Sequence, residues 1–152
     1  MIEVEVEETR WTEALPEAAA VAERAAAAAL TAGKAMGDVV VLLTDDAEVK
    51  TLNARHRGKD QPTNVLSFPG ADMPLPGQAR HLGDLVLAYE TCAAEAEQQG
   101  KSLADHLSHL TVHGVLHLLG RDHEDEPDAE AMEAEERTVL ASLGVGDPYR
   151  TE

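Results

Sequence analysis

The sequence predicts an α+β fold in which a small mixed four-stranded sheet packs against helices, with a metal site on a central helix. Three observations point to this fold class. Four short apolar segments with the character of strands are separated by helical or turn-rich stretches. The last third of the chain has the apolar spacing of successive helices. The histidines in this last third recur at helical steps beside the apolar positions.

The first two predicted strands flank an alanine-rich helix. Residues 2–6 alternate apolar side chains with glutamates, which is the pattern of a strand with one wet face. Residues 17–32 are mostly alanine and end before Gly33, so they favour a helix. Residues 39–43 form a short β-branched run that is typical of a buried strand. A strand-helix-strand unit of this kind predicts that its two strands pair in parallel.

The rest of the chain predicts two more strands and four helices. Asp45 with Glu48 has the spacing of a capping box, Ser102 is a typical N-cap, and Pro127 suits the first turn of the last helix. Because only a loop at residues 70–80 separates the last two strands, we expect these strands to pair antiparallel. The strands are expected at residues 65–68 and 85–89, and the helices at residues 45–53, 91–99, 102–119 and 127–144.

Length and composition indicate one domain without a membrane segment. The chain has 152 residues, which is enough for one hydrophobic core and too few for two ordinary ones. Its start lacks a basic segment followed by an apolar run, and no stretch approaches the roughly 20 apolar residues that cross a membrane. We therefore expect a cytoplasmic protein with no membrane partner, and the single cysteine, Cys92, agrees with this expectation.

The net charge of −17 argues against a general nucleic-acid binder, because non-specific affinity comes mostly from Lys and Arg side chains that neutralise phosphates. The basic residues are unevenly spread, however. Four of the twelve, Lys50, Arg55, Arg57 and Lys59, fall within ten positions. The sequence therefore predicts a local cationic patch in an otherwise acidic protein.

Three histidines have the spacing of a zinc site on a helix. His113 and His117 are four residues apart, so their side chains leave one face of a helix and can bind the same ion. Gly120 is suited to end that helix and turn the chain back, which would bring His123 to the ion. Three imidazoles leave the fourth tetrahedral position to water, and this arrangement suits hydrolysis. We predict one Zn²⁺ per chain in a zincin-like site, and residues 1–152 as a single metal-dependent hydrolase domain.

The same offsets occur in the metzincin proteases, in which the residue after the first histidine is the catalytic glutamate. In this chain that residue is Gly114. Proteases of that kind need the carboxylate as general base, so its absence counts against peptide hydrolysis by their mechanism. A zinc peptidase of another mechanism stays a weak alternative.

With Gly114 in place, the histidine motif closely resembles that of the YbeY family of bacterial endoribonucleases, also called rRNA maturation factors. Further segments match that family in the same order, and the resemblance spans roughly residues 38 to 149. One departure is Arg121, where the family usually has tyrosine. The matching segments are Leu52-Asn53, Arg57-Gly58-Lys59-Asp60, Pro62-Thr63-Asn64-Val65-Leu66-Ser67-Phe68-Pro69, Leu82-Gly83-Asp84-Leu85-Val86 and Asp147-Pro148-Tyr149.

The resemblance implies a zinc-dependent endoribonuclease that is specific for single-stranded RNA. It implies a role in rRNA processing, at the 3′ end of the small-subunit rRNA, and in ribosome quality control. The partners it implies are single-stranded rRNA and the ribosome or small-subunit proteins. The main alternative is a non-catalytic ribosome-assembly factor whose metal ion stabilises the fold.

Arg57 matches the active-site arginine of that family and is our candidate catalytic residue. Its planar guanidinium can hold two phosphate oxygens and stabilise the extra charge that develops on the pentacoordinate phosphorus. Arg55, His56 and Lys59 are candidates for guiding the RNA backbone into the site.

Asp84, His109 and Asp122 are candidates for orienting a metal ligand or another group of the pocket. For Asp84, an ordinary turn at a strand end after Gly83 explains the carboxylate equally well. The general base stays open, because spacing does not choose among His109, Asp122 and Glu124.

Overall fold

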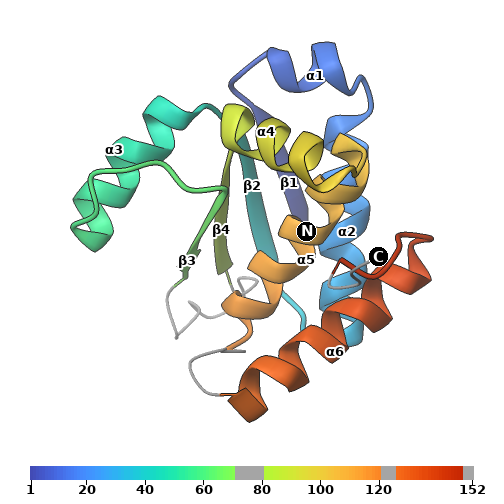
Figure 1. Ribbon diagram of the computed structural model, residues 1–152. Helices are drawn as coiled ribbons and strands as arrows, with labels where there is room; N and C mark the ends of the chain where they lie inside the picture. The colour runs from blue at the N-terminus through green and yellow to red at the C-terminus, as the bar shows by residue number, and fades with distance from the viewer. Residues whose placement is uncertain (71–80, 121–125, 149–152) are drawn as a thin grey trace.

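The computed structural model describes residues 1–70, 81–120 and 126–148, and it has the predicted mixed four-stranded sheet with helices packed against it (Figure 1). The sheet has the strand order β1-β2-β4-β3, so β3 forms one edge. β1 pairs with β2 and β2 with β4 in parallel, whereas β3 and β4 are antiparallel. Both pairing predictions are therefore confirmed. The strands are β1 (Ile2–Val6), β2 (Asp38–Thr44), β3 (Val65–Pro69) and β4 (His81–Ala88).

The predicted helices are all present in the described part of the chain, with shifted ends. Asp45 Oδ1 accepts a hydrogen bond from the Glu48 amide at 2.9 Å, and Ser102 Oγ accepts one from the Asp105 amide at 3.0 Å, so both predicted caps are confirmed. None of the helices in the described ranges is long and apolar enough to cross a membrane. The helices are α1 (Arg10–Ala14), α2 (Ala18–Ala32), α3 (Asp46–Arg57), α4 (Tyr89–Gln99), α5 (Leu103–Leu118) and α6 (Glu126–Ser142).

Two elements extend further than the sequence predicts. α3 continues past Asn53 to Arg57 and ends where Gly58 takes a φ of +71°, a left-handed conformation that favours glycine. β4 begins at His81 rather than at residue 85, because its backbone pairs with both β2 and β3 there. Backbone pairing leaves no apolar pattern in the sequence, so the pattern of side chains does not predict that β4 starts at His81.

Helix α1 was not predicted, because its 5 residues are too few for a periodic pattern. A tertiary contact holds it instead. The Trp11 side chain is fully buried, and its Nε1 donates to the Thr44 carbonyl at 2.9 Å. The Trp11 ring also stands edge-on to the ring of Tyr89, with centroids 5.4 Å apart.

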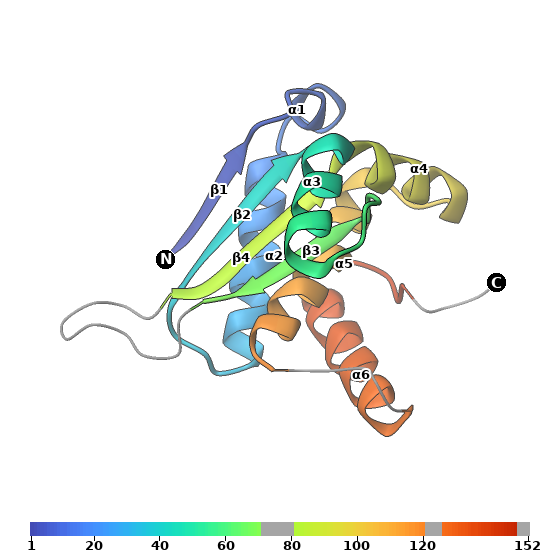
Figure 2. The ribbon, with the colours of Figure 1, turned by 90° about the vertical axis from the view of Figure 1, so that its left-hand side faces the viewer.

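Helices cover both faces of the sheet, with α3 on one side and α2 and α5 on the other, as Figure 2 shows. On one face, alternate strand residues such as Leu85 and Leu87 pack with α2 and α5 into the main core. On the other face, Val86 and Leu66 pack with Val49 of α3 into a smaller core. Since successive strand residues point to opposite faces, every residue of β3 and β4 belongs either to the α5 side or to the α3 side.

The central helix α5 lies very close to the sheet at Gly114. A Cβ atom at this position would come within 2.7 Å of Leu85 Cδ2. The Ser67 hydroxyl of β3 donates to the Gly114 carbonyl at 3.2 Å. The position that holds the catalytic glutamate of metzincins therefore faces packed side chains in this fold, and a larger residue there requires a shift of the helix or of the Leu85 side chain.

Replacing Gly114 with alanine should lower the free energy of unfolding by about 1–3 kcal/mol, because the added methyl overpacks against the fully buried Leu85. The loss should occur although alanine is intrinsically the better helix former. Urea denaturation of metal-free protein measures it. Gly146→Ala is the matched control, since a Cβ there meets nothing within 4 Å. A Gly114→Ala protein as stable as the wild type would contradict the close packing.

Candidate metal centre

His113 and His117 project from the same face of α5 and converge. Their Nε2 atoms lie 3.1 Å apart, as the four-residue spacing on a helix predicts. The two rings stand edge to face, with centroids 4.6 Å apart. They form one wall of a pocket of about 460 Å³, and the residues leading into and along the edge strand β3 form the other wall. This second wall consists of Thr63, Asn64, Val65, Ser67 and Pro69.

The two imidazoles fit a metal ion. In a tetrahedral zinc site with Zn–N bonds of about 2.0–2.1 Å, two ligand nitrogens are roughly 3.3 Å apart. The measured 3.1 Å between the two Nε2 atoms is close to this value. The third predicted ligand, His123, lies outside the described residues, as does Asp122. Within the described ranges no group of three or more His, Cys, Asp or Glu side chains is placed to hold a metal, so the zinc site stays a prediction.

A buried carboxylate orients His113. Glu136 of α6 is fully buried, and its Oε1 lies 2.5 Å from His113 Nδ1. A carboxylate accepts hydrogen bonds, so this contact places the proton of His113 on Nδ1 and leaves the Nε2 lone pair directed at His117 and the pocket. Metal-binding histidines are commonly oriented in this way by a carboxylate behind the ring.

Sequence reasoning missed Glu136, although a signal for it exists. It lies in a strongly acidic stretch that looks like a solvated helix face. However, Glu136 shares the buried stripe of α6 with Met132, Val139 and Leu140, at helical steps of three and four residues. A glutamate at an apolar position of a helix needs a buried partner, and this requirement could have singled it out.

His109 lies one helical turn before His113 and faces the same carboxylate. Its Nε2 is 3.9 Å from Glu136 Oε1, which is beyond the length of a hydrogen bond. Burial lowers the pKa of His109 to about 4, so the ring is neutral at physiological pH. The structure therefore brings His109 to the group that orients His113, and its role stays a prediction.

A second hydrogen-bond network fixes Asn64 in the pocket wall. Glu95 Oε1 of α4 accepts from Asn64 Nδ2 at 3.1 Å and lies 2.9 Å from Nε2 of the buried His106. Asn64 Oδ1 accepts from the amide of Val65 at 2.7 Å. The backbone carbonyl of Asn64 also accepts from the Ala88 amide at 3.0 Å. Asn64 is thus held at both ends of its side chain and at its backbone.

Asp84 lies on the other side of the sheet. It is the register partner of Phe68, and Phe68 packs in the smaller core under α3. Partners in an antiparallel pair point to the same face, so Asp84 is on the α3 side, whereas the histidines of α5 are on the opposite side. Its Oδ1 lies 3.0 Å from His81 Nε2. The structure therefore places Asp84 against His81 and not against the histidine pair.

The predicted basic segment forms the end of α3 and the residues after it. Arg55, His56 and Lys59 are exposed, and Arg57 is the last residue of α3. The His56 ring stands against the ring of Phe68, with centroids 5.0 Å apart. Asn53 holds the following loop, since its Nδ2 donates to the Gln61 carbonyl at 2.9 Å. This loop leads to the pocket wall at residues 63–64, so the basic segment and the histidine pair lie on the two sides of edge strand β3 (Figure 1).

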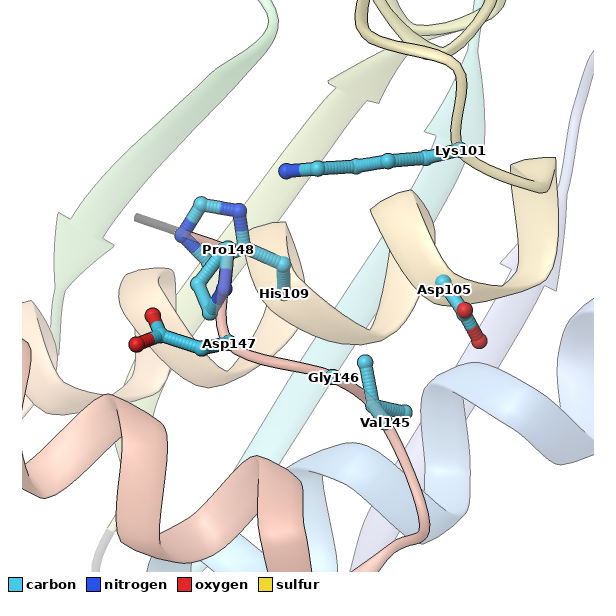
Figure 3. A pocket seen from close by; sticks show the side chains of 7 residues that line it. All are labelled: Lys101, Asp105, His109, Val145, Gly146, Asp147 and Pro148. Carbon is cyan, nitrogen blue, oxygen red and sulfur yellow. The ribbon is translucent and has the colours of Figure 1, made fainter. Parts of the chain in front are cut away.

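A second, smaller pocket of about 100 Å³ adjoins His109 (Figure 3). The side chain of Lys101, which directly precedes the cap of α5, reaches toward the His109 ring. Asp147 and Pro148, in the segment after α6, lie on the opposite side of the ring. The residues that line this pocket are Lys101, Asp105, His109, Val145, Gly146, Asp147 and Pro148.

Comparisons with known proteins show the family that this chain resembles. The family model described as "Endoribonuclease YbeY" matches residues 2–144. The protein named endoribonuclease YbeY of Paramagnetospirillum magneticum is 56% identical over 155 residues, which cover 97% of this chain and 94% of that protein. The protein of the same name from Chelativorans sp. is 59% identical over 125 residues, which cover 82% and 77%.

One solved structure has the same fold. The solution structure of TM1509 from Thermotoga maritima covers 99% of this chain and 100% of its own, with a TM-score of 0.56 and 23% sequence identity. At this identity the likeness supports the α+β architecture and carries no conclusion about the site.

Replacing Glu136 with glutamine should weaken zinc binding by about 10- to 100-fold, because the amide is a poorer acceptor for His113 Nδ1 and carries no charge. Competition of the apoprotein with a chromophoric zinc chelator measures the dissociation constant. Glu130→Gln removes the same charge from an exposed position of α6 and is the matched control. Equal zinc affinity of the two variants would mean that Glu136 does not orient a ligand.

Proposed function

This chain belongs to the YbeY endoribonuclease family, and from this premise we propose that it is a zinc-dependent endoribonuclease of single-stranded RNA that processes rRNA. The expected substrate is the 3′ end of the small-subunit rRNA, and the expected place of action is the ribosome in the cytoplasm, with a role in ribosome quality control. The observation that carries the proposal is the His113–His117 pair, whose Nε2 atoms meet 3.1 Å apart in the wall of a pocket.

The proposed ligands of the metal are His113, His117 and His123. A zinc ion held there supplies Lewis-acid chemistry to a phosphodiester and a source of hydroxide near neutral pH. The chain itself supplies the orientation of the ligands. Glu136 keeps the proton of His113 on Nδ1, so that the Nε2 lone pair faces the pocket.

The other pocket wall is suited to hold the sugar-phosphate backbone. It presents the polar side chains of Thr63, Asn64 and Ser67 opposite the two imidazoles. Asn64 keeps one amide hydrogen beyond the one that it donates to Glu95, and this hydrogen can be donated to a ribose or phosphate oxygen. Because Glu95 and the backbone of β3 hold Asn64 in place, little side-chain entropy is lost when RNA binds.

Arg57 is the proposed catalytic cation. When the phosphorus becomes pentacoordinate its oxygens gain negative charge, and a bidentate guanidinium stabilises that charge more than it stabilises the ground state. Arg55, His56 and Lys59 extend the cationic segment along the proposed path of the RNA.

We expect zinc-loaded protein to cleave a single-stranded RNA that covers the 3′ end of the small-subunit rRNA, and an identical His117→Ala preparation to leave it intact. Separation of end-labelled products on denaturing gels measures this. Cleavage by both preparations would reveal a contaminating nuclease. Cleavage by neither, with zinc bound to the wild type, would contradict the proposed activity and favour the non-catalytic assembly factor.

Arg57→Ala should reduce the cleavage rate by more than tenfold without unfolding the protein. The reason is the loss of a guanidinium that acts on the transition state, so the effect should fall on kcat. Arg24→Ala, which removes an exposed arginine from α2, is the matched control and should keep the wild-type rate. An unchanged kcat in Arg57→Ala would remove this residue from the mechanism.

Lys59→Ala should reduce the salt dependence of RNA binding, because one phosphate contact is lost. The slope of log Kd against log salt concentration is expected to fall by about one unit. Fluorescence anisotropy of a labelled RNA at several salt concentrations measures it in the absence of zinc. If the slope stays the same, Lys59 is a surface charge with no contact to RNA.

A further inference from the structure

The pocket beside His109 is separate from the pocket that holds the histidine pair, and the proposed mechanism does not use it. Its lining comes from three places in the chain: the turn before α5, α5 itself and the segment after α6. That segment includes Asp147 and Pro148, part of one of the matching sequence segments, for which no role has yet appeared. The pocket thus brings together residues from three separate segments, and packing within any one of these segments does not explain why they meet there.

The lining combines one ammonium group, two carboxylates, the flat imidazole ring of His109 and the aliphatic ring of Pro148. Lys101 contributes an ammonium group, which interacts electrostatically with the carboxylates of Asp105, Glu95 and Asp147. Asp147 contributes a carboxylate whose Oδ2 is 4.0 Å from Arg137 Nε. His109 and Pro148 present their rings between these two groups (Figure 3). Partial burial lowers the pKa of Lys101, which is consistent with an ammonium group turned toward the protein rather than toward bulk water.

This combination suits a neutral planar group better than an anion. A phosphate in the pocket would face two carboxylates, those of Asp105 and Asp147, against a single ammonium group. A nucleobase carries no charge, stacks on flat side chains such as histidine, and has donors and acceptors along its edges. Guanine and cytosine present both a carbonyl oxygen and an amino group, which match a lysine donor and a carboxylate acceptor.

The position of the pocket also fits the path of an RNA chain. His109 is four residues before His113, which corresponds to about 6 Å along the axis of α5. A phosphate at the histidine pair therefore has its neighbouring nucleotide within reach of His109. A base in a duplex is stacked and paired, so only an unpaired nucleotide can turn its base into such a pocket.

We propose that the pocket formed by Lys101, His109, Asp147 and Pro148 binds one unpaired nucleobase, guanine or cytosine, next to the phosphate that is cleaved. The inference rests on the proposed function, because it assumes that RNA lies along α5. In it, Lys101 donates to a carbonyl or ring-nitrogen acceptor of the base, Asp147 accepts from its amino group, and the ring of His109 provides the stacking surface. The pocket is thus a specificity site of the enzyme.

Binding of short RNAs to metal-free protein tests the proposal without cleavage. In a set of oligonucleotides with guanine or cytosine at every position, each base is removed in turn by an abasic nucleotide. Removal at one position should weaken binding by about 5- to 150-fold, as expected for the loss of a stacked base. Adenine or uracil at this position should bind more weakly than guanine or cytosine. Fluorescence anisotropy gives each Kd.

Pocket variants then show where that base lies. Lys101→Met and Asp147→Asn should bind the intact RNA more weakly, and removal of the critical base should cost them much less than it costs the wild type. Lys34→Met is the control, since it removes an exposed lysine from the turn after α2, outside the cationic segment, and should keep the full effect of base removal.

The outcomes separate this proposal from the proposed function. If every base removal costs the two pocket variants as much as it costs the wild type, the pocket does not bind a base, and the inference is overturned. If the coupling appears but zinc-loaded protein cleaves no RNA, the nucleobase site stands and the catalytic proposal fails.

Discussion

The close approach of α5 to β3 and β4 at Gly114 is the constraint on which the rest of the site depends. The missing side chain lets the helix backbone lie against Leu85, and the Ser67 hydroxyl bonds to the Gly114 carbonyl. His113 directly precedes this contact, so its ring stands beside the edge strand, and alternate residues of β3 become the opposite pocket wall. A larger residue at position 114 would have to displace the helix or the Leu85 side chain against which it packs.

The second constraint is electrostatic and ties α6 to α5. A fully buried carboxylate is costly unless hydrogen bonds or positive charge compensate for it, and Glu136 Oε1 accepts a hydrogen bond from His113 Nδ1 at 2.5 Å. The same contact fixes the direction of the His113 lone pair. This contact therefore contributes both to the packing of α6 and to the orientation of a proposed metal ligand, and His109 lies next to it with its ring kept neutral by burial.

The sequence predicted what depends on local geometry. Caps, strand pairing and the convergence of His113 and His117 follow from spacing within one element or between neighbours. Helical spacing places Glu136 on the buried stripe of α6, but its partner His113 is settled only by the packing of α6 against α5. Asp84 also shows what the sequence does not predict. Because Asp84 and Leu85 are adjacent in a strand, they point to opposite faces of the sheet, but the sequence does not say which of the two faces α5 covers. The structure places Arg57 at the end of α3, whereas the catalytic role proposed for it rests on the family resemblance.

An acidic protein that acts on RNA can attract the RNA phosphates only at a small part of its surface. The net charge is −17, so most of the surface repels phosphate, and α6 adds several exposed acidic side chains to that surface. The basic end of α3 and the proposed zinc ion lie on the two sides of β3, so the favourable field follows the edge of the sheet. A single RNA strand can follow this edge with its phosphates beside the basic end of α3 and the proposed zinc ion. In the proposed enzyme, attraction for RNA is thus confined to the sheet edge between the basic end of α3 and the histidine pair, while the rest of the acidic surface repels phosphate.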